Sequence, residues 1–213
     1  VVLLLIVLGA LSADLFMDYQ TKALGQNPLE RLQIPSAAHW FGTDQYGRDL
    51  FARIIFGSRY SLIFGIGCTG LSLLLGSVFG AMAAYYGGKI DAVMMRVLDA
   101  LMCIPGMLLT LALVAVIGSG LTSLTVAITI SSVPGFTRMT RSVVLSVVQQ
   151  DFVEAARSCG TKDRDIILFH VIPNAVGPII VNGMMNIAGI IMSAAGLSYI
   201  GMGINPPTPE WGS

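Results

Sequence analysis

Long stretches without a charged residue dominate the chain and set its predicted architecture. Four runs carry no Asp, Glu, Lys or Arg: residues 1–13, 60–88, 100–137 and 171–209. Because a membrane-spanning helix needs about 20 apolar residues, the second run predicts one span and the third predicts two, folded back around Gly118-Ser119-Gly120. The fourth run predicts one span, from about residue 175 to residue 199, and the first predicts the end of another. We therefore expect an all-α, polytopic transmembrane bundle with five spans, one of them incomplete.

The composition supports a membrane protein. Of the 213 residues, 54% are hydrophobic and only 11% are charged, whereas soluble domains carry about 25% charged residues. Membrane strands would alternate polar and apolar residues, and these runs do not. The zero net charge argues against a nucleic-acid partner. Three cysteines without CxxC spacing predict neither a metal site nor a disulfide framework, and we expect no cofactor.

The charged residues gather in three islands between the apolar runs, at residues 14–59, 89–99 and 138–165. Two spans separate the second island from the third, so these two lie on one side and the first lies on the other. Together they hold seven basic residues against five in the first, which favours a cytoplasmic location for them. Residues 14–61 then form an extracytoplasmic loop with an interfacial helix.

Local charge pairs are expected in these islands. Asp49 and Arg53 have the i, i+4 spacing of an ion pair on the interfacial helix, and Arg96 and Asp99 are three residues apart. Contact with a substrate or a binding protein is the alternative for the first island. Four aromatic residues fit an interfacial belt better than a ligand cage: Trp40, Tyr85, Tyr86 and Trp211.

Small residues within the second run predict close helix packing. Gly76, Gly80 and Ala84 recur every four residues, which lets a neighbouring helix approach closely.

Residues 150–174 form the most informative segment. Phe152, Ala156 and Cys159 would share one apolar helix face, Gly160 suits the left-handed residue that ends a helix, and Thr161 can cap a second short helix. Pro173 then breaks the run before the last span. Such an apolar ridge fits either a groove in a partner protein or the chain's own helices.

The spacing within this segment resembles a known family. Glu154-Ala155-Ala156, Gly160 and then His170-Val171-Ile172-Pro173 are similar to the EAA loop of ABC importer permeases, although His170 and Ile172 depart from the usual Ile and Leu. The resemblance implies a type I permease fold with six spans, in which residues 150–174 couple to an ATPase. It implies this role for Glu154, Ala155, Ala156, Gly160 and Pro173.

Two further segments narrow the resemblance. Residues 41–49, with Arg53, Gly57, Arg59 and Ser61-Leu62, and residues 206–212 are similar to the C-type subunit of the dipeptide, oligopeptide and nickel permease family. The three motifs cover roughly His39 to Ser213.

The resemblance implies half of a translocation pathway for di- and oligopeptides, within a single transmembrane domain over residues 1–213. Its implied partners are a second homologous permease subunit, two ATP-binding cassette subunits, an extracytoplasmic binding protein and the lipid bilayer. The chain has no Gly-x-x-x-x-Gly-Lys-Ser/Thr phosphate loop, so we expect it to hydrolyse no ATP itself.

Several alternatives stay open. The same architecture could import nickel complexes or glutathione. A secondary transporter would need charges at mid-membrane. An intramembrane enzyme would need a nucleophile within the membrane, and Ser131 and Ser132 are candidates for it by residue type alone. Both ends look cut, so we expect a fragment whose sixth span would follow Ser213.

Overall fold

The structure is a computed structural model that describes residues 2–204 and 207–212. Its elements in chain order are α1 (Val2–Phe16), η1 (Tyr19–Leu24), η2 (Pro28–Glu30), α2 (Leu50–Tyr86), α3 (Gly88–Met102), α4 (Gly106–Ile117), α5 (Leu121–Val148), α6 (Asp151–Ser158), α7 (Asp163–Asp165), η3 (Ile166–Val171) and α8 (Ile172–Tyr199). Over the described residues the only β pairing is an isolated bridge between Thr43 and Asp49. The predicted all-α class is confirmed.

Among the described residues, two helices are long and apolar enough to cross a membrane. They are α2 and the continuous helix Asp163–Tyr199, each of 37 residues. The pair α3 and α4 passes the same test only as one broken span, bent by 82°. The count of five spans therefore stays a prediction. At 1.5 Å per residue, each long helix measures about 55 Å, which exceeds the roughly 30 Å hydrocarbon core of a bilayer.

This excess length explains why helices reach into charged stretches. Helix α2 begins at Leu50, ten residues before the uncharged run, and Asp49 caps its start by accepting a hydrogen bond from the Ala52 backbone N–H at 3.0 Å. The helix expected within residues 14–61 is thus the first part of α2 and not a separate element.

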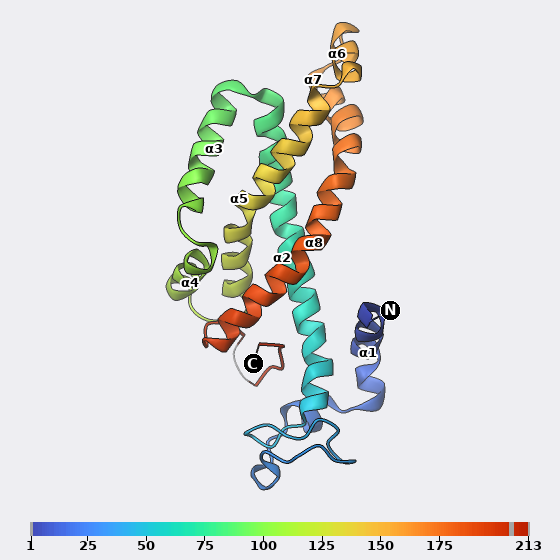
Figure 1. Cartoon of the computed structure of the whole chain (residues 1–213), viewed down its shortest axis with the longest axis vertical. Coiled ribbons are helices and arrows are strands. Elements are labelled where there is room, and N and C mark those ends of the chain that lie inside the picture. The colour runs from blue at the N-terminus through green and yellow to red at the C-terminus, as the bar shows by residue number, and fades with distance from the viewer. Residues whose placement is uncertain (1, 205–206, 213) are drawn as a thin grey trace. The chain divides into compact units, whose positions relative to one another are not determined.

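The chain divides into two compact units. The first, unit 1, consists of Val1–Gly65, Ile117–Leu124 and Ile191–Ser213. In it α1 lies alongside the first turns of α2 (Figure 1), where Arg59 donates hydrogen bonds to the Ala10 carbonyl and, at 2.7 Å, to Asp14. The buried residues that hold these parts together are Ala13, Ala23, Ala52 and Phe56.

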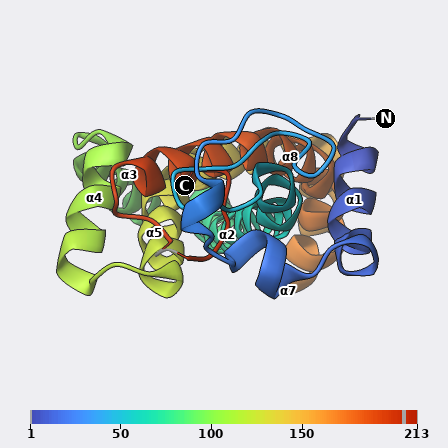
Figure 2. The same ribbon diagram turned by 90° about the horizontal axis from the view of Figure 1, so that it is seen from below.

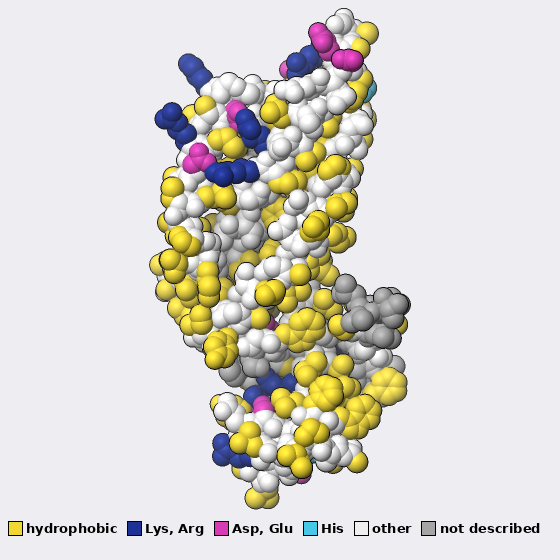
Figure 3. Space-filling model, viewed as in Figure 1, with side chains coloured by type: hydrophobic (Ala, Val, Ile, Leu, Met, Phe, Trp, Pro, Cys, Tyr) yellow, Lys and Arg dark blue, Asp and Glu magenta, His cyan; other side chains and the backbone are white. Residues whose placement is uncertain are grey.

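The second, unit 2, consists of Ile66–Val116 and Thr125–Ile190. Here α5 crosses α2 in the view of Figure 1 and lies between α2 and the α3–α4 pair in the view of Figure 2. Ser131 on α5 shares a 2.8 Å hydrogen bond with Thr110 on α4. Figure 3 shows hydrophobic side chains over one face of α3 and α4, with charged side chains gathered where α3 adjoins α5 and over α6.

A helix break falls at the predicted Gly118-Ser119-Gly120, whereas the two spans expected on either side of it stay a prediction, because α4 passes the length and hydropathy test only together with α3. Helix α4 ends at Ile117 and α5 begins at Leu121. Gly118 and Gly120 have φ values of 106° and 139°, a backbone conformation that side chains with a Cβ rarely adopt. The second bend, between α3 and α4, is an addition to the expected topology and falls at Pro105, which cannot supply a helical N–H.

Candidate functional site

The segment 150–174 presents one buried side and one exposed side. Helix α6 begins after Gln150, and its Val153 is 1% exposed. Val153 belongs to the apolar core of unit 2 together with Ala84, Val144, Ile166, Val171 and Ala175. On the other side, Phe152 is 40% exposed and Phe169 is 70% exposed, and Glu154 and Ala155 are also exposed. The segment is therefore anchored through its aliphatic residues and leaves acidic and aromatic side chains free to contact another molecule.

Gly160 terminates α6 by its backbone conformation. Its φ is +77°, its N–H donates to the Arg157 carbonyl at 2.9 Å, and the Thr161 N–H reaches back to the Ala156 carbonyl at 3.2 Å. This is the pattern of a left-handed helix end. A Cβ on Gly160 would meet no atom within 4 Å, so the need for glycine here is conformational and not spatial.

One local expectation for this segment was wrong, and one was left open between two alternatives. Phe152 and Cys159 are exposed, as the partner alternative expects, whereas Val153 and the half-buried Ala156 pack on the core. The cap of α7 is Lys162, without a side-chain hydrogen bond, and not Thr161.

Pro173 does not break the run. It is the second residue of α8, and the helix passes through it because the π-helical turn η3 comes first. In that turn the Ile172 N–H donates to the Ile167 carbonyl, five residues back. A wider turn of this kind accommodates irregular residues within a helix. The second short helix is therefore the beginning of the continuous helix Asp163–Tyr199.

Tyr85 links α2 to this segment, a contact that the sequence did not reveal. Its hydroxyl donates to Asp163 Oδ1 at 2.5 Å, and the Arg157 guanidinium lies 5.3 Å from the centre of its ring. The sequence predicted that Tyr85 lies in an interfacial aromatic belt, which names no partner for its side chain. Because the partners lie more than 70 residues away, no local spacing could have indicated this contact.

Gly76 and Gly80 lie where α2 and α5 approach each other. A Cβ on Gly76 would lie 2.5 Å from Phe136 Cβ, and one on Gly80 would lie 2.6 Å from the Thr137 carbonyl oxygen. Both distances are far shorter than a normal carbon contact, so only glycine fits at this helix spacing.

Two ion pairs join α3 to α5. Arg141 donates to both carboxylate oxygens of Asp91 at 2.5 Å, and Arg138 pairs with Asp99. Asp99 is thus paired across helices and not with Arg96, as the local spacing had indicated.

In unit 1, the charges expected on the interfacial helix also find distant partners. Asp49 contacts His39 Nδ1 at 2.9 Å, so the expected Asp49–Arg53 pair was wrong. Arg53 instead donates to the carbonyls of Ala23 at 3.3 Å and Pro207 at 3.2 Å. The cause is the loop that precedes α2, which folds back and brings His39 over the start of the helix.

Asp44 organises that loop. It accepts hydrogen bonds from the Tyr46 N–H at 2.8 Å, the Arg48 N–H at 3.0 Å and Arg48 Nε at 2.6 Å. Burial by itself would raise the pKa of Asp44, but the hydrogen bonds from Arg48 and Tyr46 outweigh it, and the pKa lies below its ordinary value of 3.8.

The two outer motifs contact each other in unit 1. Trp211 donates from its backbone N–H to Ser61 Oγ at 3.3 Å and from Nε1 to the Ile54 carbonyl at 3.2 Å. The Glu210 backbone lies against Gly57, 3.3 Å from the position of a Cβ there. Segments about 150 residues apart therefore form one structure; Pro206, the first residue of the second motif, lies outside the described residues.

The helical arrangement is that of a known class of membrane protein. It is similar to the solved structure of the methionine ABC transporter MetNI in inward-facing conformations, with a TM-score of 0.64 and 17% identity over 71% of this chain and 76% of that chain. The fold is accordingly that of a type I ABC importer permease.

The particular family follows from the sequence comparison. Residues 76–213 match the family described as binding-protein-dependent transport system inner membrane component, and the chain belongs to this family. It is 43% identical over 186 residues to the dipeptide transport system permease protein DppC of Alkalihalophilus pseudofirmus, covering 87% of this chain and 61% of that protein. It is also 43% identical over 179 residues to the glutathione transport system permease protein GsiD of Pectobacterium atrosepticum, covering 84% of this chain and 60% of that protein. The chain thus spans about 60% of the length of these curated relatives.

Proposed function

We propose that the chain forms half of the translocation pathway of an ATP-driven importer for di- and oligopeptides in a bacterial inner membrane. A second homologous permease subunit completes the pathway, two ATP-binding cassette subunits drive it, and an extracytoplasmic binding protein delivers the substrate. The observation that carries this proposal is the segment 150–174, which is anchored in the core of unit 2 by Val153, Ile166 and Val171 while it exposes Phe152 and Glu154. The names of the relatives support the substrate class.

Coupling between the ATPases and the pathway follows from helix continuity. The helix Asp163–Tyr199 begins within the segment 150–174 and continues without a break for 37 residues. When an ATPase subunit moves the docked α6, the part of this helix within unit 2, residues 163–190, carries the displacement as a rigid element, which is the kind of switching that alternating access requires. Glu154 supplies a polar contact for the ATPase, the exposed Ala155 lets it approach closely, and the half-buried Ala156 packs on the core of unit 2. Gly160 ends α6, and Pro173 lies in the first turn of α8 within the continuous helix.

ATP hydrolysis belongs to the partners in this proposal. The chain has no phosphate-binding loop, and its coupling segment holds only contacts between helices and exposed side chains. The chain therefore converts motion into access and carries out no chemistry of its own.

Nickel complexes and glutathione are the alternative substrates, and glutathione is favoured by the name of the Pectobacterium relative, GsiD. A secondary transporter is the distant alternative. It would use a proton gradient and would need no ATPase.

The test is uptake by the intact transporter in proteoliposomes. The full-length subunit is reconstituted with its second permease subunit, ATPases and binding protein, and the import of labelled dipeptide, glutathione and nickel is measured. The proposal expects import of the dipeptide only with ATP on the ATPase side. Import driven by a proton gradient without ATP would refute it. ATP-driven import of glutathione or nickel, without import of the dipeptide, would keep the ATP-driven importer but show that peptides are not its substrate.

A further inference from the structure

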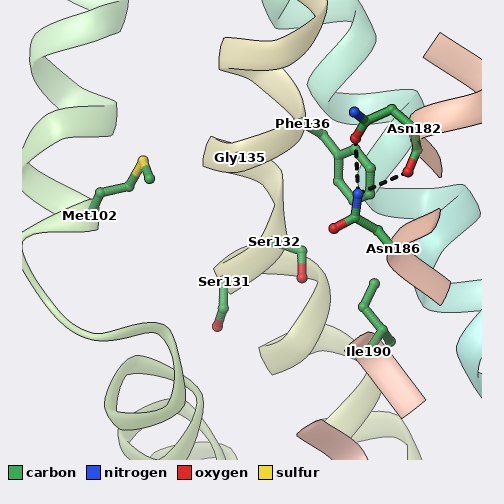
Figure 4. A pocket seen from close by; sticks show the side chains of 8 residues that line it. All are labelled: Met102, Ser131, Ser132, Gly135, Phe136, Asn182, Asn186 and Ile190. Atoms are coloured by element: carbon green, nitrogen blue, oxygen red, sulfur yellow. Dashed lines mark hydrogen bonds between the residues drawn. The ribbon is translucent and has the colours of Figure 1, made fainter. Parts of the chain in front are cut away.

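A cavity of about 320 Å³ opens between three helices of unit 2. Figure 4 shows side chains from α3, α5 and α8 around it. The residues that line it are Met102, Ser131, Ser132, Gly135, Phe136, Asn182, Asn186 and Ile190. Its volume lies at the lower end of the roughly 300–1,000 Å³ range of small-molecule sites, and every lining residue is uncharged.

Two asparagines on α8 give the cavity its chemistry. Asn186 Nδ2 donates to the backbone carbonyl of Asn182 at 2.8 Å and to Asn182 Oδ1 at 2.9 Å (Figure 4). Because a backbone carbonyl can only accept, this bond fixes which way the Asn186 amide points. Within the described part of the chain, the amide nitrogen of Asn182 and the amide oxygen of Asn186 have no other partner. The pair therefore offers one donor and one acceptor, held one helical turn apart.

The serine hydroxyls opposite are not equivalent. Ser131 donates to the Ala127 carbonyl at 2.7 Å and also bonds with Thr110 at 2.8 Å, so its polar atom is already used within the bundle. Among the described residues Ser131 pairs with no base, which argues against a nucleophilic role. Ser132 comes one residue later on the same helix and points into the space between α5 and α8 (Figure 4).

The amide groups of Asn182 and Asn186 need a polar partner because they lie on an apolar helix. Helix α8 belongs to a segment apolar enough to cross a membrane, and an amide that faces hydrocarbon without a partner costs several kcal/mol. Polar side chains within spans therefore lie toward a bundle interior or a water-filled pathway.

We propose that this cavity is a substrate-contact site that holds the backbone amide group of a peptide on its way through the importer. Asn182 Nδ2 donates to the peptide carbonyl, and Asn186 Oδ1 accepts from the peptide N–H. The absence of charge among the lining residues lets the site accept peptides whatever the charge of their side chains. Dipeptides and glutathione share this amide group. The inference rests on the proposed function and adds the chemical group that the pathway recognises.

The test compares a peptide with an analogue that lacks the N–H. Uptake of Ala-Ala and of its ester analogue, in which oxygen replaces the amide nitrogen, is measured in proteoliposomes that contain the whole transporter. The variants are Asn182→Leu and Asn186→Leu. Met185→Leu, at an exposed neighbouring residue that does not line the cavity, is the control. The same binding protein serves every variant, so its own preference cancels in the comparison.

Each asparagine has its own expected signature. Loss of one neutral hydrogen bond changes an equilibrium by about fivefold. Asn186→Leu should reduce the preference for the amide over the ester by about fivefold, because it removes the acceptor for the N–H. Asn182→Leu should lower uptake of both compounds by a similar factor, since the carbonyl is present in both. Met185→Leu should behave as the wild type. A glutathione arm should show the same loss with Asn182→Leu.

Other results would overturn the inference. An unchanged amide preference in Asn186→Leu would show that this oxygen does not contact the substrate. Loss of the second permease subunit on purification of either variant would show that the asparagines seat a helix of that subunit instead. If the wild type imports neither peptide nor glutathione with ATP, the proposed function fails by itself.

A labelling experiment then still reports on the site. Asn186→Cys is placed in a variant whose natural cysteines are replaced by serine: Cys68, Cys103 and Cys159. A water-soluble thiol reagent should label this cysteine, and Ala-Ala should slow the labelling. Labelling that the peptide leaves unchanged contradicts the assignment.

Discussion

Replacing Gly80 by alanine tests the packing of α2 on α5. The added Cβ would lie 2.6 Å from the Thr137 carbonyl oxygen, 2.8 Å from Thr140 Cβ and 2.9 Å from the Arg141 backbone nitrogen. Two of these three atoms belong to the backbone of α5, so the helices must separate. Overpacking of this kind costs about 1–3 kcal/mol, and the upper end applies because backbone atoms cannot rotate away. The better helix propensity of alanine returns about 1 kcal/mol, which leaves a net loss of about 2 kcal/mol.

The control is Gly67→Ala on the same helix, where a Cβ would meet no atom within 4 Å. This change gains helix propensity without a clash, so it should be neutral or stabilising by up to about 1 kcal/mol. Thermal unfolding of the purified transporter in detergent measures both. For a chain of this size, 1 kcal/mol shifts the midpoint by about 2–4 °C, so Gly80→Ala should unfold about 4–8 °C lower than the wild type. Equal midpoints for the two variants would refute the packing argument.

Three further predictions concern polar contacts. Because the folded pKa of Asp44 lies below its unfolded value, its contribution to stability is present above pH 4 and is lost as the pH falls through the folded pKa. Asp44→Asn should therefore flatten the acid side of the profile of stability against pH. An unchanged profile would count against the hydrogen bonds described for Asp44. Tyr85→Phe should remove the hydrogen bond to Asp163 and accelerate amide hydrogen exchange in α6 and α7, whereas unchanged exchange would show that the contact does not hold the segment. A double-mutant cycle with Asp91→Asn and Arg141→Gln should give a coupling energy of about 1 kcal/mol in thermal unfolding, and additive effects would show that the pair contributes nothing.

The uncharged runs predicted where helices lie but not where they end. The helix break at Gly118 and Gly120 could be predicted because both glycines are needed for their φ angles. The starts of α2 and of the helix Asp163–Tyr199 were placed too late, since a span was taken to end where charge begins. A helix can continue beyond the hydrocarbon once a cap such as Asp49 satisfies its first N–H groups.

The sequence could not show which charged residues pair with each other. Spacing proposed Asp49–Arg53 and Arg96–Asp99, because residues four or three apart are neighbours on a helix. The structure pairs Asp49 with His39 and Asp99 with Arg138, which depends on how loops and helices pack. The left-handed Gly160 could be predicted because its conformation is local, whereas Asn182 and Asn186 gain their meaning only from the cavity that α3 and α5 complete.

The proposed function depends above all on coupling through the segment 150–174, and the ratio of dipeptide imported to ATP hydrolysed measures that coupling. Gly160→Val places a β-branched residue at φ +77°, which costs about 1–2 kcal/mol, whereas Gly160→Asn is the matched control because asparagine tolerates this conformation. Both variants should insert and assemble, and both should hydrolyse ATP. We expect import per ATP to fall to background in Gly160→Val and to stay near the wild-type ratio in Gly160→Asn. A wild-type ratio in Gly160→Val would show that the segment 150–174 does not couple hydrolysis to import.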